Sequence, residues 1–139
     1  MKALLDSCVI SELVSKKPNP KVAEFVDSLD PEDVYLSVIT FGEIVKGIEK
    51  LSKSRRKTDL RNWLNDDLLV RFEGNILALD ADILIEWGAL TARLESAGKT
   101  MPAIDSLIAA SALAKRMALV TRNVSDFEET NVEIANLWK

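Results

Sequence analysis

The segment Lys2-Ala3-Leu4-Leu5-Asp6 is a short apolar run that ends in a carboxylate, and such a run predicts a buried strand. Similar runs recur at Val34–Ser37, Ile76–Leu79, Ala118–Thr121 and, most weakly, Val132–Ala135. Helical patterns separate these runs. Strands that alternate with helices predict a parallel sheet covered on both faces. We therefore expect one α/β domain over residues 1–139, with four or five parallel strands sandwiched between helices.

The helices between these strands can be placed from apolar spacing and from end signals. We expect a helical turn at Ser11–Val14 and helices over Pro20–Asp30, from Thr40 to Ile48, over Arg55–Arg71, from Asp80 to Gly98 and from Pro102 to Met117. Asp80 is the predicted N-cap of its helix, and Gly98 its predicted end. The helix from Pro102 is apolar on nearly all sides, which predicts a central position.

The composition narrows the class of protein. The chain has 139 residues, of which 47% are apolar and 29% charged, as in an ordinary globular domain. No run approaches the roughly 20 apolar residues of a membrane span. The N-terminus lacks the apolar core of a signal peptide. The single cysteine, Cys8, cannot form an internal disulfide, which fits a cytoplasmic protein.

Histidine is absent from the chain, and this count constrains the chemistry most. It excludes Ser-His-Asp and Cys-His nucleophile systems, a histidine general base, and zinc sites of the Cys/His kind. Hydrolytic chemistry must then come from carboxylates, lysines, hydroxyls or a metal held by oxygen.

The formal charge is −4, so net charge alone does not favour nucleic-acid binding. The segment from Lys46 to Arg61 is different, because it carries seven basic and two acidic residues. It is either a solvated surface or a ridge that contacts phosphates. The candidate RNA-binding residues on such a ridge are Lys50, Lys53, Arg55, Arg56 and Lys57.

Four acids far apart in the sequence are predicted to converge. Ligands of open parallel sheets bind beyond the carboxyl ends of the strands. Asp6 ends the first strand, and Asp126 follows the strand at residues 118–121. Glu43 and Asp105 fall in the first turns of predicted helices, which face the same edge. We call this predicted group the acidic rim.

Each acid also has a structural explanation. Thr40-Phe41-Gly42-Glu43 matches a capping box, in which Glu43 would bond back to a backbone N–H. The helix dipole favours Asp105 in a first turn, and Asp126 could cap a turn or a helix. Asp6 is the hardest to explain in this way, because a carboxylate buried after an apolar strand is costly unless it is paired or bound to a metal.

Taken together, the four acids favour a metal site. Close carboxylates raise one another's pKa in an empty pocket, and a divalent cation relieves that repulsion. Ligands that are all oxygen favour Mg²⁺, with Mn²⁺ also possible, over zinc. A metal in such a site suits phosphodiester hydrolysis, because it polarises the phosphoryl oxygen and activates water.

Four segments resemble the motifs of the PIN-domain nucleases. Leu4–Leu13 resembles the opening LLDTNVxSEL, and residues 37–48 resemble S-x-x-T-x-x-E-[IL]-x-x-G-[IL]. Pro102–Ala110 is similar to the helix start P-x-x-D-x-x-I-A-A, and Thr121–Phe127 to the ending T-x-N-x-x-D-F. The motifs follow in order over nearly the whole chain. Among PIN proteins, the small single-domain form resembles the VapC and FitB toxins of toxin–antitoxin pairs.

This resemblance implies a PIN fold and an Mg²⁺-dependent ribonuclease toxin, usually a homodimer, that a cognate antitoxin inhibits. It places the catalytic carboxylates on Asp6, Glu43, Asp105 and Asp126, with Asp6, Asp105 and Asp126 as metal ligands. Supporting roles fall on Ser7, Thr121 and Asn123; the neutral Asn123 is expected to orient the cluster or a bound water.

One departure from the family pattern could reduce activity. Ser7 and Cys8 stand where the family usually has Thr and Asn, and a thiol is a weak hydrogen-bond partner compared with an amide. The alternative interpretation is a catalytically weak or inactive PIN scaffold that binds a partner protein or RNA. A phosphoacceptor receiver domain fits less well, because Asp6 stands alone and no lysine site follows the last strand.

Overall fold

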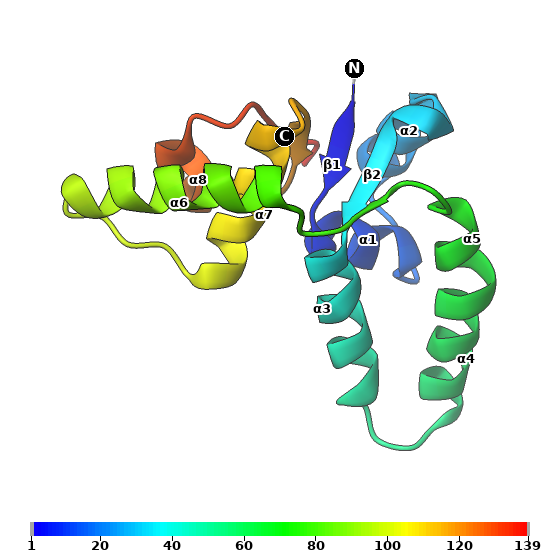
Figure 1. The fold of residues 1–139 in the computed structure, drawn as a ribbon. Helices are drawn as coiled ribbons and strands as arrows, with labels where there is room; N and C mark the ends of the chain where they lie inside the picture. The colour runs from blue at the N-terminus through cyan, green and yellow to red at the C-terminus, as the bar shows by residue number, and fades with distance from the viewer. Residues whose placement is uncertain (1, 139) are drawn as a thin grey trace.

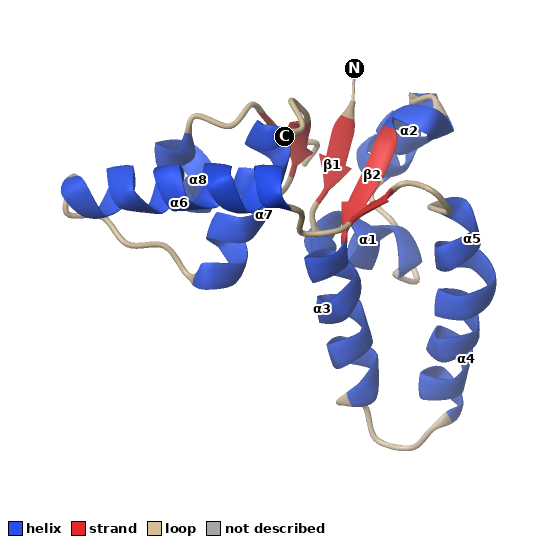
Figure 2. Cartoon of the chain, viewed as in Figure 1, coloured by secondary structure: helices blue, strands red, loops and turns tan. Residues whose placement is uncertain are grey.

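The computed structural model describes residues 2–138, and its centre is a five-stranded parallel sheet (Figures 1 and 2). The strands are β1 Ala3–Leu5, β2 Val34–Ser37, β3 Ile76–Leu77, β4 Ala118–Val120 and β5 Ile134–Ala135. Their order across the sheet is β3-β2-β1-β4-β5, and every neighbouring pair is parallel. The predicted α/β class is confirmed. The strand β2 has the predicted bounds, whereas β4 is one residue shorter and β1, β3 and β5 are each two residues shorter than the apolar runs that predicted them.

Alternate residues of the strands face two separate cores. Ala3 and Leu5 belong to one buried cluster, whereas Leu4 and Leu119 belong to the other. Successive side chains of a strand point to opposite faces of a sheet, so a fully apolar strand needs cover on both sides. All three residues of β1 are completely buried.

Helices cover the two faces of the sheet (Figure 1). The helices that pack against the first core are α1 Ser7–Val14, α2 Pro20–Ser28, α3 Val38–Glu49 and the helical segment from α4 Arg55–Trp63 to α5 Leu69–Arg71. Those that pack against the second core are α6 Ala81–Ser96, α7 Ala103–Ala114 and the short α8 Val124–Phe127. A π-helical stretch, Leu64–Leu68, joins α4 to α5, and 3₁₀ turns lie at Pro31–Asp33 and Glu128–Thr130. In Figure 1, α3 and α4 form a hairpin that extends away from the sheet.

The start of α3 corrects the sequence prediction. The helix begins at Val38, because the Ser37 hydroxyl caps it by accepting a hydrogen bond from the Ile39 N–H at 3.0 Å. Thr40 therefore lies inside the helix, and the predicted capping box with Glu43 does not form. Both Ser37 and Thr40 are good caps in isolation. The sequence does not identify Ser37 as the cap, because this residue also ends an apolar strand. The first helix likewise begins earlier than predicted, directly after Asp6.

Other predicted helix ends are confirmed. The Asp80 carboxylate accepts a hydrogen bond from the Ile83 N–H at 2.9 Å at the start of α6. Gly98 follows that helix with φ of +71°, a conformation that glycine adopts without strain. The predicted central helix, α7, buries Ile108 and three of its alanines. Within residues 2–138, no helix has the length and apolar character needed to cross a membrane.

Candidate active site: an acidic rim at the strand ends

Asp6 is the most firmly held residue of the acidic rim. Its side chain is 7% exposed. One carboxylate oxygen accepts a hydrogen bond from the Ser7 N–H at 2.8 Å and caps α1, and the other accepts from the Thr121 hydroxyl at 2.8 Å. Each carboxylate oxygen has about two lone-pair positions. Asp6 therefore has a fixed orientation and keeps acceptor capacity for a further ligand.

Thr121 ties the first strand to the loop after β4. Its side chain is fully buried, and its hydroxyl accepts a hydrogen bond from the Asn123 N–H at 3.1 Å while donating to Asp6. Asn123 thus acts on the rim through its backbone. Its side chain is exposed and does not cap α8.

Cys8 lies beside this pair of residues. Its sulfur is 3.9 Å from an Asp6 carboxylate oxygen and 3.7 Å from the Thr121 hydroxyl, and it accepts a hydrogen bond from the Arg122 N–H at 3.4 Å. Burial is the largest cause that raises the pKa of the Cys8 thiol, and the Asp6 charge raises it further. The thiol therefore stays protonated at neutral pH and serves as a weak polar contact.

The electrostatics link all four acids of the rim. Burial, and then the charges of Asp6 and Asp105, raise the pKa of Glu43, while Lys46 acts in the opposite direction. Burial, and then the charges of Asp126 and Asp6, raise the pKa of Asp105. Like charges that face one another destabilise the ionised forms. The fold therefore brings Asp6, Glu43, Asp105 and Asp126 into one field of unbalanced negative charge.

Within residues 2–138, no three Asp, Glu or Cys side chains are positioned to hold one ion together, so Asp6, Asp105 and Asp126 do not form a preassembled site of three carboxylates. Mg²⁺ normally binds one or two protein carboxylates and completes its shell with water and substrate phosphates. All the rim donors are carboxylate oxygens, and no side chain of the described chain forms an ion pair with them. The residues present therefore fit a partly hydrated Mg²⁺ or Mn²⁺.

The predicted basic ridge divides into residues with different surroundings. The Lys57 ammonium donates to the carbonyls of Glu49 and Leu51 at the end of α3, both at 3.0 Å. Arg61, which adds to the positive charge of this segment, donates to both carboxylate oxygens of Glu49, at 3.1 and 3.0 Å. Of the predicted ridge residues, Lys57 therefore also has a structural role, because it joins the two helices of the hairpin.

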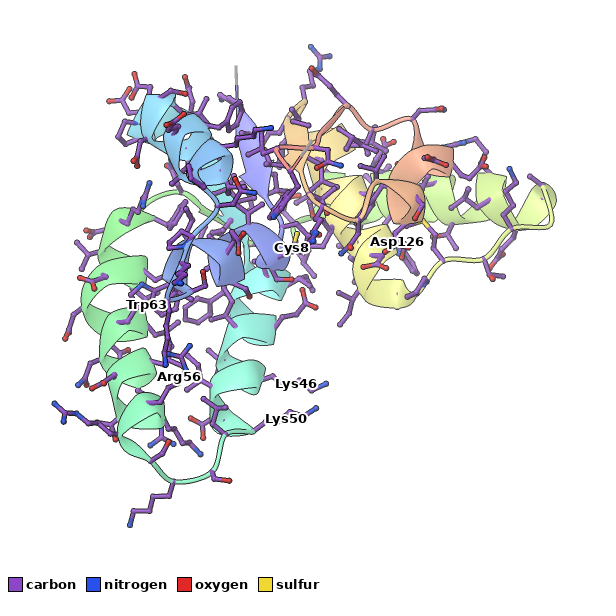
Figure 3. All side chains as sticks on the ribbon, turned by 180° about the vertical axis from the view of Figure 1, so that it is seen from behind. Cys8, Lys46, Lys50, Arg56, Trp63 and Asp126 are labelled. Atoms are coloured by element: carbon purple, nitrogen blue, oxygen red, sulfur yellow. The ribbon has the colours of Figure 1, made fainter. Side chains whose placement is uncertain are left out.

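The other basic residues of the hairpin face in different directions. Arg56 lies with Trp63 between α3 and α4, whereas Lys46 and Lys50 project from the opposite side of α3 (Figure 3). Lys53 and Arg55 are exposed near the turn between the two helices.

Two cavities border the rim. A groove of about 420 Å³ lies between α1, α3 and α4, and the residues that line it are mostly apolar but include Glu43, Ser7 and Arg56. A second cavity, of about 360 Å³, is lined by Asp105 and Asp126 together with the ion pair of Lys99 and Glu129, whose atoms are 2.6 Å apart. The quoted motifs contribute residues to both cavities, such as Glu43 and Asp105, but no single motif indicates a cavity, because each cavity is formed by elements that are distant in the chain.

The model of the PIN domain family matches residues 3–132. The chain belongs to the PIN-domain family. It is 35% identical to the toxin FitB of Neisseria gonorrhoeae over 97% of both chains. It is 33% identical to the VapC ribonuclease Y4jK of Sinorhizobium fredii, over 98% of this chain and 97% of that protein.

Solved structures with chains similar to this one agree with this assignment. The crystal structure of FitAcB from Neisseria gonorrhoeae contains a chain that matches with a TM-score of 0.92 and 34% identity over 98% of both chains. VapBC2 from Rickettsia felis, bound to a DNA fragment from its promoter, contains a chain that matches with a TM-score of 0.81 and 25% identity, also over 98% of both. The predicted membership and the predicted fold are thus confirmed.

Proposed function

We propose that this PIN protein is a metal-dependent endoribonuclease that acts as the toxin of a toxin–antitoxin pair. The observation that carries the proposal is the acidic rim, in which burial and then neighbouring carboxylates raise the pKa of both Glu43 and Asp105. Relatives that align over nearly the whole chain are named as a toxin and as a VapC ribonuclease, which supports the same function.

The rim residues have different parts in the proposed reaction. Asp6, Asp105 and Asp126 would hold the metal, some of them through water. A divalent cation bound there polarises the phosphoryl oxygen and lowers the pKa of the attacking water. Ser7 and Thr121 keep the Asp6 carboxylate in place. Asn123 holds Thr121 through its backbone N–H.

Glu43 is the proposed proton acceptor. It is partly buried, and the burial and neighbouring charges that raise its pKa bring it closer to neutral pH. A general base is most effective when its pKa lies near the working pH. A Glu43 carboxylate oxygen would therefore take the proton of the attacking water, which is then directed at an RNA phosphate.

The groove beside Glu43 is the proposed antitoxin site. Its walls include Ile10 on α1, Ile48 on α3 and Leu60 and Trp63 on α4, which suits the apolar face of a partner segment. Arg56 adds a cation for an acidic side chain or a chain end. An antitoxin seated there would stand next to Glu43 and block access to the rim. We also expect a homodimer, because Ile85 on α6 and Ile104 on α7 are 71% and 44% exposed.

The alternative is a PIN scaffold with weak or no catalysis. Cys8 favours it, because its sulfur makes long contacts with Asp6 and Thr121 where an amide would bond more strongly. Changes of this kind around a metal site can cost 10–100-fold in affinity or activity.

One experiment separates the two proposals. Purified protein is incubated with total RNA in Mg²⁺ or in EDTA, and the 5′ ends of the fragments are sequenced; Asp105→Asn serves as the matched inactive control. Cleavage at defined sites that needs both Mg²⁺ and Asp105 supports the nuclease. Equal fragment patterns from wild type and Asp105→Asn contradict it and favour the scaffold.

A further inference from the structure

Helix α3 carries two different surfaces that meet at Glu43. One contributes Ile44, Gly47 and Ile48 to the groove described above. The other carries Glu43, Lys46 and Lys50, which follow at intervals of three and four residues and therefore share one face of the helix. Figure 3 shows Lys46 and Lys50 projecting from α3 on the side away from α4. We call Lys46 and Lys50 the lysine stripe.

The lysine stripe is a free pair of cations beside the site. Both lysines are exposed, and within residues 2–138 neither forms an ion pair or a side-chain hydrogen bond. This contrasts with Lys57, which the hairpin uses internally, and with Arg56, which faces the groove. Lys46 also lies close enough to the rim for its positive charge to oppose the rise in the pKa of Glu43 that burial and the neighbouring acids cause.

A nucleic acid approaching the rim meets four carboxylates, which repel its phosphates. A bound metal offsets that repulsion only at the scissile phosphate. The phosphates on either side need other cations, and the lysine stripe begins one helical turn from Glu43. Its two residues are about 6 Å apart along the helix axis. This spacing allows neighbouring phosphates of one strand each to meet a lysine.

We propose that Lys46 and Lys50 bind consecutive backbone phosphates of single-stranded RNA and guide the strand along α3 to the rim at Glu43. The inference rests on the proposed ribonuclease function and assigns a path to its substrate. Of the candidate RNA-binding residues predicted from charge counting, it selects Lys50 and adds Lys46 from the same basic segment. Phosphate contacts carry no direct sequence information, so the stripe positions RNA without choosing the cleavage site.

The test compares two double variants that each remove two positive charges. Lys46→Ala/Lys50→Ala removes the stripe, and the control Lys16→Ala/Lys17→Ala removes two exposed cations between α1 and α2, outside the predicted ridge. Binding of a fluorescent single-stranded RNA of mixed sequence is measured in EDTA over a range of KCl concentrations, and thermal melting checks the fold of each variant. Lys46→Arg/Lys50→Arg keeps both charges and should bind as the wild type does.

Each phosphate contact contributes about 0.7 to the slope of log K on log salt, where K is the association constant for the single-stranded RNA. Loss of two contacts should therefore flatten that slope by about 1.4 and weaken binding about 25-fold at about 0.1 M salt. The control variant Lys16→Ala/Lys17→Ala should keep the wild-type slope. Single-turnover cleavage in Mg²⁺ at saturating RNA should change much less than affinity in the stripe variant, as expected for residues that bind but do not react.

The possible failures are distinguishable. If both double variants lose affinity equally, net charge alone controls binding and the stripe has no special role. If the stripe variant binds RNA as the wild type does while the wild type cleaves RNA in Mg²⁺, the proposed RNA path along α3 is wrong. The proposed ribonuclease function is then supported without it. If the wild type neither binds nor cleaves RNA, the proposed function fails and the stripe fails with it.

Discussion

The acidic rim and the α3–α4 hairpin carry opposite charge and differ in how that charge is balanced. In the hairpin, the Arg61 guanidinium meets the Glu49 carboxylate, and Lys57 meets two carbonyls. In the rim, Asp6 is held only by neutral donors, and burial together with neighbouring carboxylates raises the pKa of Glu43 and of Asp105. Paired charges, as in the hairpin, stabilise local structure. Unpaired carboxylates that lie close together, as in the rim, instead indicate a binding site for a cation.

The largest expected effect is on catalysis by the rim. Asp105→Asn and Asp6→Asn should reduce Mg²⁺-dependent RNA cleavage by more than about 100-fold, which exceeds the usual effect of residues around a metal site. Stability in EDTA should hold or rise for Asp105→Asn, because the change removes a repelling charge. It should hold for Asp6→Asn, because Asn caps a helix as well as Asp does. A marked fall in melting temperature of both variants would make these acids structural.

Glu43→Gln should lower the rate by about 10²–10⁴-fold, the usual contribution of a general base, with little change in stability. The structure removes the competing capping-box role, because Ser37 caps α3. Single-turnover kinetics of the Gln variant, with Glu49→Gln on the same helix as control, measure the effect. Full activity in Glu43→Gln would exclude Glu43 from the reaction.

Thr121→Val should have an intermediate effect. The change keeps the shape but removes the hydroxyl that joins Asp6 to the loop at Asn123. We expect a 10–100-fold loss of activity and Mg²⁺ affinity, and a loss of about 1–3 kcal/mol in stability from unpaired buried groups. Thr121→Ser keeps the hydroxyl and should restore most of the activity and Mg²⁺ affinity. Equal defects in the Val and Ser variants would show that packing of the methyl group, and not the hydrogen bond, is what matters.

The smallest effect is expected in the hairpin. Arg61→Ala breaks an ion pair whose side chains are 50% and 53% exposed. Exposed pairs contribute only about 0.2–1 kcal/mol, and high salt weakens them further. Urea unfolding should register this small loss, while RNA cleavage stays at the wild-type rate. A large loss of cleavage in Arg61→Ala would mean that the balanced hairpin also serves the reaction.

The sequence predicted the fold better than it predicted the surfaces. Apolar runs such as Lys2–Asp6 located the strands, because burial on both faces leaves little choice of residue type. The ends of helices were less certain, as Ser37 and Thr40 show, because two cap residues compete within one segment. The division of the basic residues between Lys57 and the lysine stripe depends on tertiary contacts. No count of charges could have indicated it.

The central claim is that repulsion within the rim is relieved by a divalent cation, and melting temperature against pH tests it most directly. The folded-state pKa values of Glu43 and Asp105 are raised, so the folded protein holds their protons more tightly than the unfolded chain does. By linkage, protonation of Glu43 and Asp105 stabilises the folded state at pH values below their unfolded-state pKa values of about 4. This stabilisation is lost as pH rises through their higher folded-state pKa values. In EDTA, wild type should therefore lose stability relative to Asp105→Asn between acidic and neutral pH, and Mg²⁺ should restore it at neutral pH in wild type alone. A difference between the two proteins that depends on neither pH nor Mg²⁺ would contradict the claim.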